Sequence, residues 1–210
     1  MSAAVINIVM MSVTVNTNYD SRMGRWEPDS RGRLEEAALN LYGKRGFENT
    51  TVEEITARAG LSERTFFRHF ADKREVLFYE AAALQQLLVD AVVSAPASAT
   101  PLDAVGSAFD AAGALLQERR DYARRRHAII AASPELRERE LIKLATLSTA
   151  LATALRQRGV KDSAATLVGE VAIVVFKTAF ERWVDSANER ALPAVMRESF
   201  SELRTVISTS

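Results

Sequence analysis

The sequence predicts an all-α protein, and three of its features lead to this prediction. The helix formers Ala, Leu, Glu and Arg are abundant, whereas the 210 residues include only nine Gly and five Pro. Apolar residues recur at the i, i+3, i+4, i+7 spacing of a buried helical surface. Ser, Thr or Asp precedes several of these stretches and Gly follows them, which is the arrangement found at helix ends. We expect a three-helix N-terminal unit followed by a larger helical body, with about nine helices altogether.

The composition is that of a globular protein and excludes several classes of function. Hydrophobic residues make up 48% of the chain and charged residues 26%, as in ordinary soluble proteins. Because Cys is absent, disulfides and thiol chemistry are excluded, and we expect a cytoplasmic protein without a membrane partner. A Gly-rich phosphate loop, an H-E-x-x-H motif and a convincing carboxylate pair are also missing. We therefore expect no enzyme, no catalytic or metal-binding residues and no cofactor.

The net charge of zero counts mildly against a nucleic-acid partner without excluding one. A DNA-binding protein requires basic residues on the surface that docks on DNA, and the whole chain need not be basic. Several basic residues are close together in one segment: Arg64, Arg68, Lys73 and Arg74. Their position therefore carries more weight than the total charge.

We expect the chain to divide into a flexible arm over residues 1–29, an N-terminal unit over residues 30–76 and a body over residues 77–210. Residues 3–15 are fairly apolar, but the segment is too short to span a bilayer and follows no basic region. The arginines between positions 22 and 33 either form a basic arm that reaches DNA or have no role.

The first expected helix begins near Ser30, which would cap it, and ends at Gly46. Phe47 is expected to fold back on this helix end. The buried surface of the helix consists of apolar residues at helical spacing: Leu34, Ala37, Ala38, Leu41 and Tyr42. We expect this helix to support the two that follow.

Residues 51–70 predict two short helices joined by a tight turn. Thr51 is placed to cap the first helix, with Glu54 three residues later to complete a capping box. Gly60 ends that helix where a positive φ is needed, and Ser62 caps the second helix.

The second of these helices is predicted to have an apolar side and a polar side. Phe66 and Phe70 lie four residues apart and face the core, so Arg64, Thr65, Arg68 and His69 are expected to point outward together. Such a surface suits insertion into a DNA major groove, where Arg binds guanine or phosphate and Thr binds a base. The alternatives are a solvated αα-hairpin or a hairpin that binds another protein.

The run R-L-E-E-A-A-L-N-L-Y-G-K-R-G-F-E-N-T-T-V-E-E-I-T-A-R-A-G-L-S-E-R-T-F-F-R-H-F-A-D-K-R-E-V-L-F, residues 33–78, resembles the N-terminal helix-turn-helix domain of TetR-family transcriptional regulators. Two positions differ from the residues that are usual in the family. Phe67 stands where Tyr usually offers a hydroxyl to phosphate, and Thr56 stands where Ala is common. The resemblance also implies that Lys73 contacts phosphate.

The function implied by this resemblance is that of a homodimeric repressor that binds double-stranded, palindromic operator DNA and responds to a small-molecule effector of unknown identity. An activator with the same DNA-binding domain is an alternative. Paired recognition helices would read half-sites about 34 Å apart. Thr50 and Thr51, at a helix N-terminus, are a natural phosphate site. The expected DNA contacts are Thr50, Thr51, Ser62, Arg64, Thr65, Phe67, Arg68, His69 and Lys73.

The body is predicted to contain helices separated by clear breaks. One helix begins at residues 71–75, and residues 94–101 form a loop. The next runs from about Leu102 to Arg120. Ser133 and Pro134 open another, which continues to Gly159. The last two helices are expected over residues 162–188 and 193–207.

A basic cluster over residues 119–127 has two interpretations. It holds an anionic ligand such as a phosphorylated or acyl-thioester metabolite, or it is a structural feature, either solvated or paired with nearby acids such as Glu135, Glu138 and Glu140. His127 has no partner at metal-ligand spacing. The expected lining of a mostly apolar ligand pocket is Phe109, Leu116, Arg126, His127, Ile130 and Phe176.

The segment 168–180 is apolar almost all round, so a helix formed by it must be buried on every side. We expect it to cover the pocket with one face and a second copy of the chain with the other. The resemblance likewise implies a four-helix dimer interface. The alternative is a monomeric core. The expected interface residues are Val175, Phe180, Trp183, Met196, Phe200 and Leu203.

Overall fold

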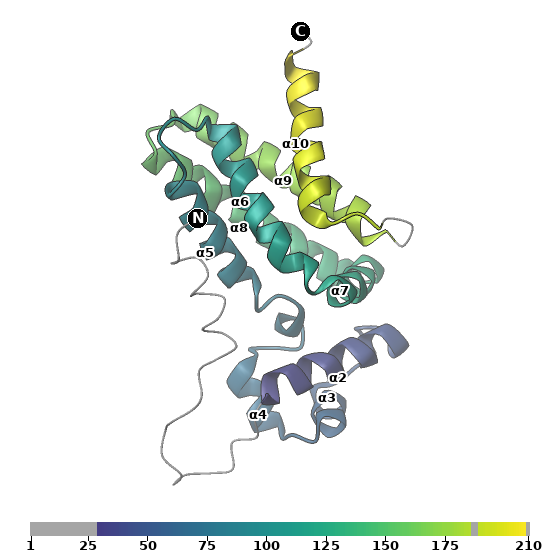
Figure 1. Ribbon diagram of the computed structural model, residues 1–210. Helices are drawn as coiled ribbons and strands as arrows, with labels where there is room; N and C mark the ends of the chain where they lie inside the picture. The colour runs from purple at the N-terminus through teal and green to yellow at the C-terminus, as the bar shows by residue number, and fades with distance from the viewer. Residues whose placement is uncertain (1–28, 186–188, 209–210) are drawn as a thin grey trace.

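The structure, a computed structural model, describes residues 29–185 and 189–208 of the chain, and these residues form helices without a strand. The all-α prediction is confirmed. Figure 1 shows a small N-terminal unit at the bottom and a larger helical body above it. The N-terminal unit consists of α2 (Ser30–Arg45), α3 (Val52–Ala59), α4 (Glu63–His69) and the 3-10 turn η1 (Glu75–Leu77). The body consists of α5 (Ala81–Val93), α6 (Pro101–Gln117), α7 (Arg120–Ala132), α8 (Pro134–Gln157), α9 (Asp162–Val184) and α10 (Leu192–Ser208).

The helix ends of the N-terminal unit follow the predicted signals closely. Thr51 and Glu54 form the full capping box of α3, and Gly60 ends that helix with a φ of 65°. The Ser62 side chain accepts a hydrogen bond from the backbone N–H of Thr65 at the start of α4. At α2 the cap is Asp29, and Ser30 is the first helical residue.

The prediction of a helix starting at residues 71–75 was wrong. The Asp72 carboxylate accepts hydrogen bonds from the backbone N–H groups of Arg74 and Glu75, at 2.8 and 3.1 Å. This is the hydrogen bonding of a helix N-cap, but the turn that follows it is a short 3-10 turn. The chain makes only the turn η1 there, and α5 begins at Ala81.

Two further boundaries differ from expectation. The helix expected to reach Arg120 ends at Gln117, and a new helix, α7, starts at Arg120. The helix expected to reach residue 188 ends at Val184. The arm expected over residues 1–29 lies, except for Asp29, outside the described residues. Arg31 and Arg33, considered as part of that arm, belong to α2.

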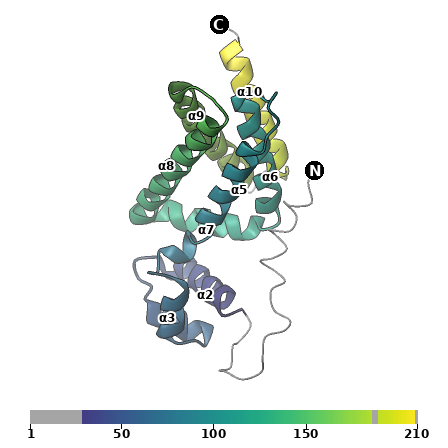
Figure 2. The ribbon, with the colours of Figure 1, turned by 90° about the vertical axis from the view of Figure 1, so that its left-hand side faces the viewer.

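The buried apolar residues form two clusters, one in each part of the protein. The lower cluster contains the core of α2, α3 and α4 together with the residues of η1. Ile129, Ile130 and Leu136, from the end of α7 and the start of α8, also belong to it. The corner between α7 and α8 is therefore built into the core of the N-terminal unit, and Figure 2 shows α7 lying across the boundary between the two parts.

The upper cluster joins α5, α6, α8, α9 and α10. The helices α8 and α9 pack closely at Gly169, where a Cβ would lie 2.7 Å from the carbonyl oxygen of Ser148. Any larger residue would push the two helices apart there. The last helix, α10, packs on α6 and α9, and its C-terminal end projects from the body (Figure 1).

Candidate nucleic-acid interface

The exposed side of α4 is held in place by its buried side. Phe66 is 0% exposed and Phe70 is 2% exposed, and their rings lie 5.4 Å apart in the lower cluster. Arg64 and Arg68 lie on the exposed side, as predicted. Phe67 lies there too, with 55% of its surface exposed. The short helix thus presents two guanidinium groups and an aromatic ring to the surroundings.

His69 and Thr65 are less available than the sequence suggested. The His69 ring nitrogen Nε2 lies 2.8 Å from Oγ of Ser30, so the ring turns toward the start of α2. Burial, together with the positive charges of Arg68 and Arg31, holds the pKa of His69 below its usual range. The Thr65 hydroxyl lies 3.0 Å from Oγ of Ser62. The prediction of one shared outward surface is therefore correct for the two arginines and must be corrected for His69.

Two residues of the connection between α2 and α3, residues 46–51, were predicted to contact phosphate, Thr50 and Thr51. Thr50 is buried, and its hydroxyl donates to the carbonyl oxygen of Gly46 at 2.9 Å. The Thr50 hydroxyl is therefore bonded inside the connection, so the expected contact between this side chain and phosphate must be corrected. Thr51 is exposed, but its backbone N–H donates to the Glu54 carboxylate.

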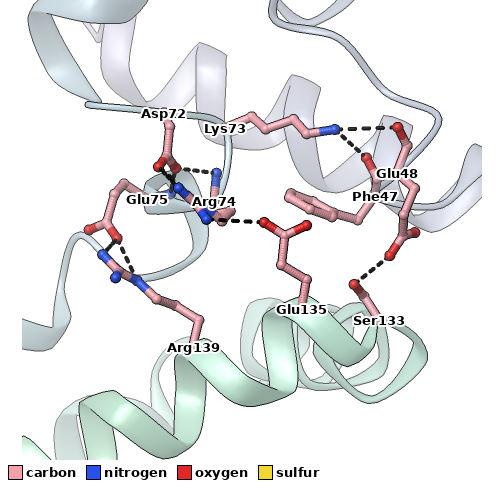
Figure 3. Close-up of polar contacts among 9 residues, drawn as sticks. All are labelled: Phe47, Glu48, Asp72, Lys73, Arg74, Glu75, Ser133, Glu135 and Arg139. Carbon is pink, nitrogen blue, oxygen red and sulfur yellow. Dashed lines mark hydrogen bonds and ion pairs between the residues drawn. The ribbon is translucent and has the colours of Figure 1, made fainter.

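Lys73 was expected to contact phosphate, yet the structure shows it bound to the protein itself. Its ammonium donates to the carbonyl oxygens of Phe47 and Thr50, both at 2.9 Å; Figure 3 shows the bond to Phe47. It also lies 3.4 Å from the carbonyl oxygen of Glu48. Lys73 therefore ties the segment after α4 to the connection between α2 and α3.

This geometry provides a small protruding helix with a basic exposed side, backed by a rigid apolar core. Comparison with known proteins identifies the family. Residues 34–79 match the family described as bacterial regulatory proteins, tetR family, and residues 99–208 match the MftR C-terminal domain. The chain belongs to the TetR family. The resemblance inferred from residues 33–78 is confirmed.

Individual relatives of the TetR family match only part of the chain in sequence. The HTH-type transcriptional regulator TcmR of Streptomyces glaucescens is 40% identical over 82 residues, which are 39% of this chain and 36% of that protein. The mycofactocin biosynthesis transcriptional regulator MftR of Mycobacterium tuberculosis is 31% identical over 58 residues, 28% of this chain and 29% of that protein. The chain thus spans about a third of the length of these curated relatives.

The fold extends over more of the chain than the sequence similarity does. A solved transcriptional regulator from Pseudomonas aeruginosa PAO1 has a TM-score of 0.61 to this structure at 19% identity. The similarity covers 90% of this chain and 96% of that one. The two proteins therefore share the overall helical fold.

The basic cluster over residues 119–127 is used for contacts inside the protein. Arg119 pairs with Glu80, and Arg125 donates to the Glu36 carboxylate at 2.6 Å. Arg126 binds the carbonyl oxygen of Leu77 at 2.7 Å and Glu140 at 3.0 Å. Of the two interpretations, the structure shows ion pairing, with Glu140 as one of the expected acids. Glu135 pairs with Arg74 instead.

The six predicted pocket residues fall into two groups. Phe109 stacks on Phe176 with ring centres 5.2 Å apart, and His127 lies 5.8 Å from the ring of Phe180. Leu116 packs against the same upper cluster. Arg126 and Ile130 lie at the boundary with the N-terminal unit instead, so their placement in the pocket must be corrected.

Most of the predicted dimer residues belong to the core of a single chain. Val175, Met196 and Phe200 are buried in the upper cluster, and so is Trp183, whose indole N–H donates to Gln117 at 2.9 Å. Phe180 and Leu203 are half-buried against the same cluster. The prediction was wrong for the four buried residues, because their periodicity reflects packing inside the chain.

Proposed function

We propose that this chain is a cytoplasmic transcriptional regulator that binds operator DNA as a homodimer and is released from it by a small-molecule effector. The exposed arginines of α4 support this proposal most directly. Arg64 and Arg68 lie on one side of a helix whose other side is buried through Phe66 and Phe70. In a TetR-type N-terminal unit, that side faces the major groove, where Arg binds guanine edges or phosphate.

The surface of α9 supports the dimer. Leu167 and Val174 are 65% and 63% exposed, and Val171 lies between them at helical spacing. Only 33% of the most apolar 18-residue stretch of α9 is buried within one chain. An exposed row of large apolar residues of this kind, with only Glu170 and Lys177 as charged neighbours on the same side, indicates a protein partner. A second copy related by two-fold symmetry would cover it and would pair the two α4 helices for half-sites about 34 Å apart.

The effector is proposed to bind within the body, beside the aromatic residues Phe109, Phe176 and Phe180. The ring centre of Phe176 lies 5.2 Å from that of Phe109 and 5.8 Å from that of Phe180. This row of aromatic rings favours an apolar or aromatic ligand. A ligand that prefers a conformation unable to bind DNA would release the operator through its differential affinity for the two states.

The test is binding of the purified protein to DNA from upstream of its own coding sequence, measured over a series of salt concentrations. We expect protection of a palindrome that survives competitor DNA. Replacing Arg64 or Arg68 by Ala should abolish this protection while leaving the fold and the dimer unchanged. If the replaced arginine contacts phosphate, its loss should also reduce the slope of log K against log salt concentration by about one.

The matched control is Lys161→Ala, which removes one exposed positive charge just before α9, far from α4 along the chain. It should leave operator binding unchanged. If the Arg64→Ala and Arg68→Ala proteins bound the operator as tightly as the unaltered protein, α4 would not be the DNA-binding surface.

A further inference from the structure

The start of α8 departs from the usual chemistry of a helix cap. Ser133 stands at the cap position, directly before Pro134, where a serine side chain ordinarily accepts a hydrogen bond from the first turn. That bond is not made. The Ser133 hydroxyl instead donates to Oε1 of Glu48 at 2.6 Å, across the boundary to the N-terminal unit (Figure 3). Ser133 is 1% exposed, so the contact is shielded from water on the body side.

Glu48 lies in the connection 46–51, which leads directly into the cap of α3 at Thr51. The same connection is held from the opposite side by Lys73, through the carbonyl oxygens of Phe47 and Thr50. The connection is thus fixed both by the segment that follows α4 and by the body. The hydrogen bond from Ser133 is also the main reason why the pKa of Glu48 lies below its usual range.

Two further contacts join the first turns of α8 to the N-terminal unit. Glu135 lies 3.1 Å from the guanidinium of Arg74. One turn later, Arg139 pairs with Glu75, which also lies 3.6 Å from Lys143. Figure 3 shows Glu135 and Arg139 reaching from α8 toward the segment around η1. The beginning of α8 therefore carries a set of complementary charges for this segment, in addition to the bond to Glu48.

We propose that Ser133 is a positioning residue for DNA binding, which sets the connection 46–51 and the start of α3 through its bond to Glu48. This inference rests on the proposed function. A displacement of the α7–α8 corner would then change the DNA-facing surface directly, in parallel with the covalent path through α5. We infer this role because the Ser133 hydroxyl binds Glu48 across the boundary and does not cap its own helix.

The test compares amide hydrogen exchange of the full chain in the unaltered protein and in Ser133→Ala. Loss of the bond should speed exchange within the connection 46–51 by about tenfold. Exchange in the α2 core, the thermal unfolding midpoint and the oligomeric state should not change. Ser133→Thr keeps the hydroxyl and should restore slow exchange. Unchanged exchange in 46–51 for Ser133→Ala would overturn the inference.

Operator affinity provides the second readout, by a double-mutant cycle with Glu48→Ala. Ser133→Ala should weaken operator binding several-fold, and Ser133→Thr should recover it. In the Glu48→Ala background, the Ser133 substitution should have no additional effect, because the bond is already absent. Additive effects, or unchanged operator affinity for Ser133→Ala, would overturn the positioning role. Failure of the unaltered protein to bind any operator would instead overturn the proposed function, and the exchange measurement would still decide whether Ser133 orders the connection.

Discussion

The ammonium of Lys73 lies 4.3 Å from the centre of the Phe47 ring while donating to the carbonyl oxygen of the same residue at 2.9 Å. A cation over an aromatic face gains from the negative potential of the ring, and the backbone carbonyls satisfy its N–H groups. One side chain thus joins two segments 26 residues apart in the sequence. Its first role in this structure is to hold the N-terminal unit together.

Lys73→Met should therefore destabilise the protein as well as weaken DNA binding. The substitution removes charge-assisted bonds to carbonyls that are partly buried, and we expect a loss of about 2 kcal/mol in the free energy of unfolding. Chemical denaturation followed by circular dichroism measures this loss. Lys161→Met, at an exposed position, is the control. If stability were unchanged while operator binding was lost, Lys73 would act mainly on phosphate.

Phe67→Tyr should strengthen operator binding. The Phe67 ring is 55% exposed on the side of α4 that carries Arg64 and Arg68, so an added hydroxyl can extend outward, toward a phosphate of the proposed operator, without disturbing the core. A hydrogen bond to a charged group contributes about 1 kcal/mol or more, which corresponds to an affinity gain of about fivefold. Titration of the operator with both proteins at one salt concentration tests this. Unchanged or weaker binding would place Phe67 away from the DNA backbone.

Sequence signals located the helices of the N-terminal unit because caps and turns act over three or four residues. Thr51, Gly60 and Ser62 do what their local spacing predicted. The role of Ser133 depends on Glu48, 85 residues away, and no local pattern distinguishes its hydroxyl from that of a capping serine. Buried Trp183 and exposed Val174 lie on the same apolar helix. Periodicity along such a helix cannot tell which side meets the rest of the chain and which meets a partner.

Two adjacent glutamates of α2 should affect stability with opposite signs. Burial raises the pKa of Glu35, with a further contribution from Glu80, so folding disfavours its charged form. Its ionisation therefore lowers the free energy of unfolding as pH rises through its folded pKa, and this cost persists at neutral pH. Glu35→Gln should be more stable than the unaltered protein at pH 7.5. The gain should shrink below the ordinary Glu pKa of about 4.3.

Glu36 provides the matched comparison. The hydrogen bond from Arg125 is the main cause that lowers the pKa of Glu36. The charged Glu36 carboxylate stabilises the fold at pH values above the ordinary Glu pKa. This stabilisation is lost as the pH falls through the lower pKa that Glu36 has in the folded protein. Glu36→Gln should thus be less stable at pH 7.5, and the difference should vanish in acid. Denaturant unfolding at several pH values measures both variants, and effects of the same sign at pH 7.5 would contradict the prediction.

Val174→Asp should dissociate the proposed dimer. Val174 is 63% exposed in the middle of the apolar surface of α9, and a carboxylate there would have to be buried without a partner when two copies associate. Sedimentation velocity at micromolar concentration should show a monomer. Val93→Asp, at a position 42% exposed near the end of α5, is the control and should remain a dimer. A dimeric Val174→Asp protein would place the interface elsewhere.

Two arginines of α7 bind main-chain atoms at the end of α9. Arg120 donates to the carbonyl oxygen of Trp183 at 2.8 Å, and Arg124 donates to those of Val184 and Asp185 at 3.0 and 2.9 Å. Every amino acid supplies the same carbonyl. The side chain of Val184 can therefore change without loss of these hydrogen bonds, whereas the two arginines cannot be replaced by residues without donor groups. We expect divergence among descendants of this protein to accumulate on the α9 side of the contact while the α7 side stays constant.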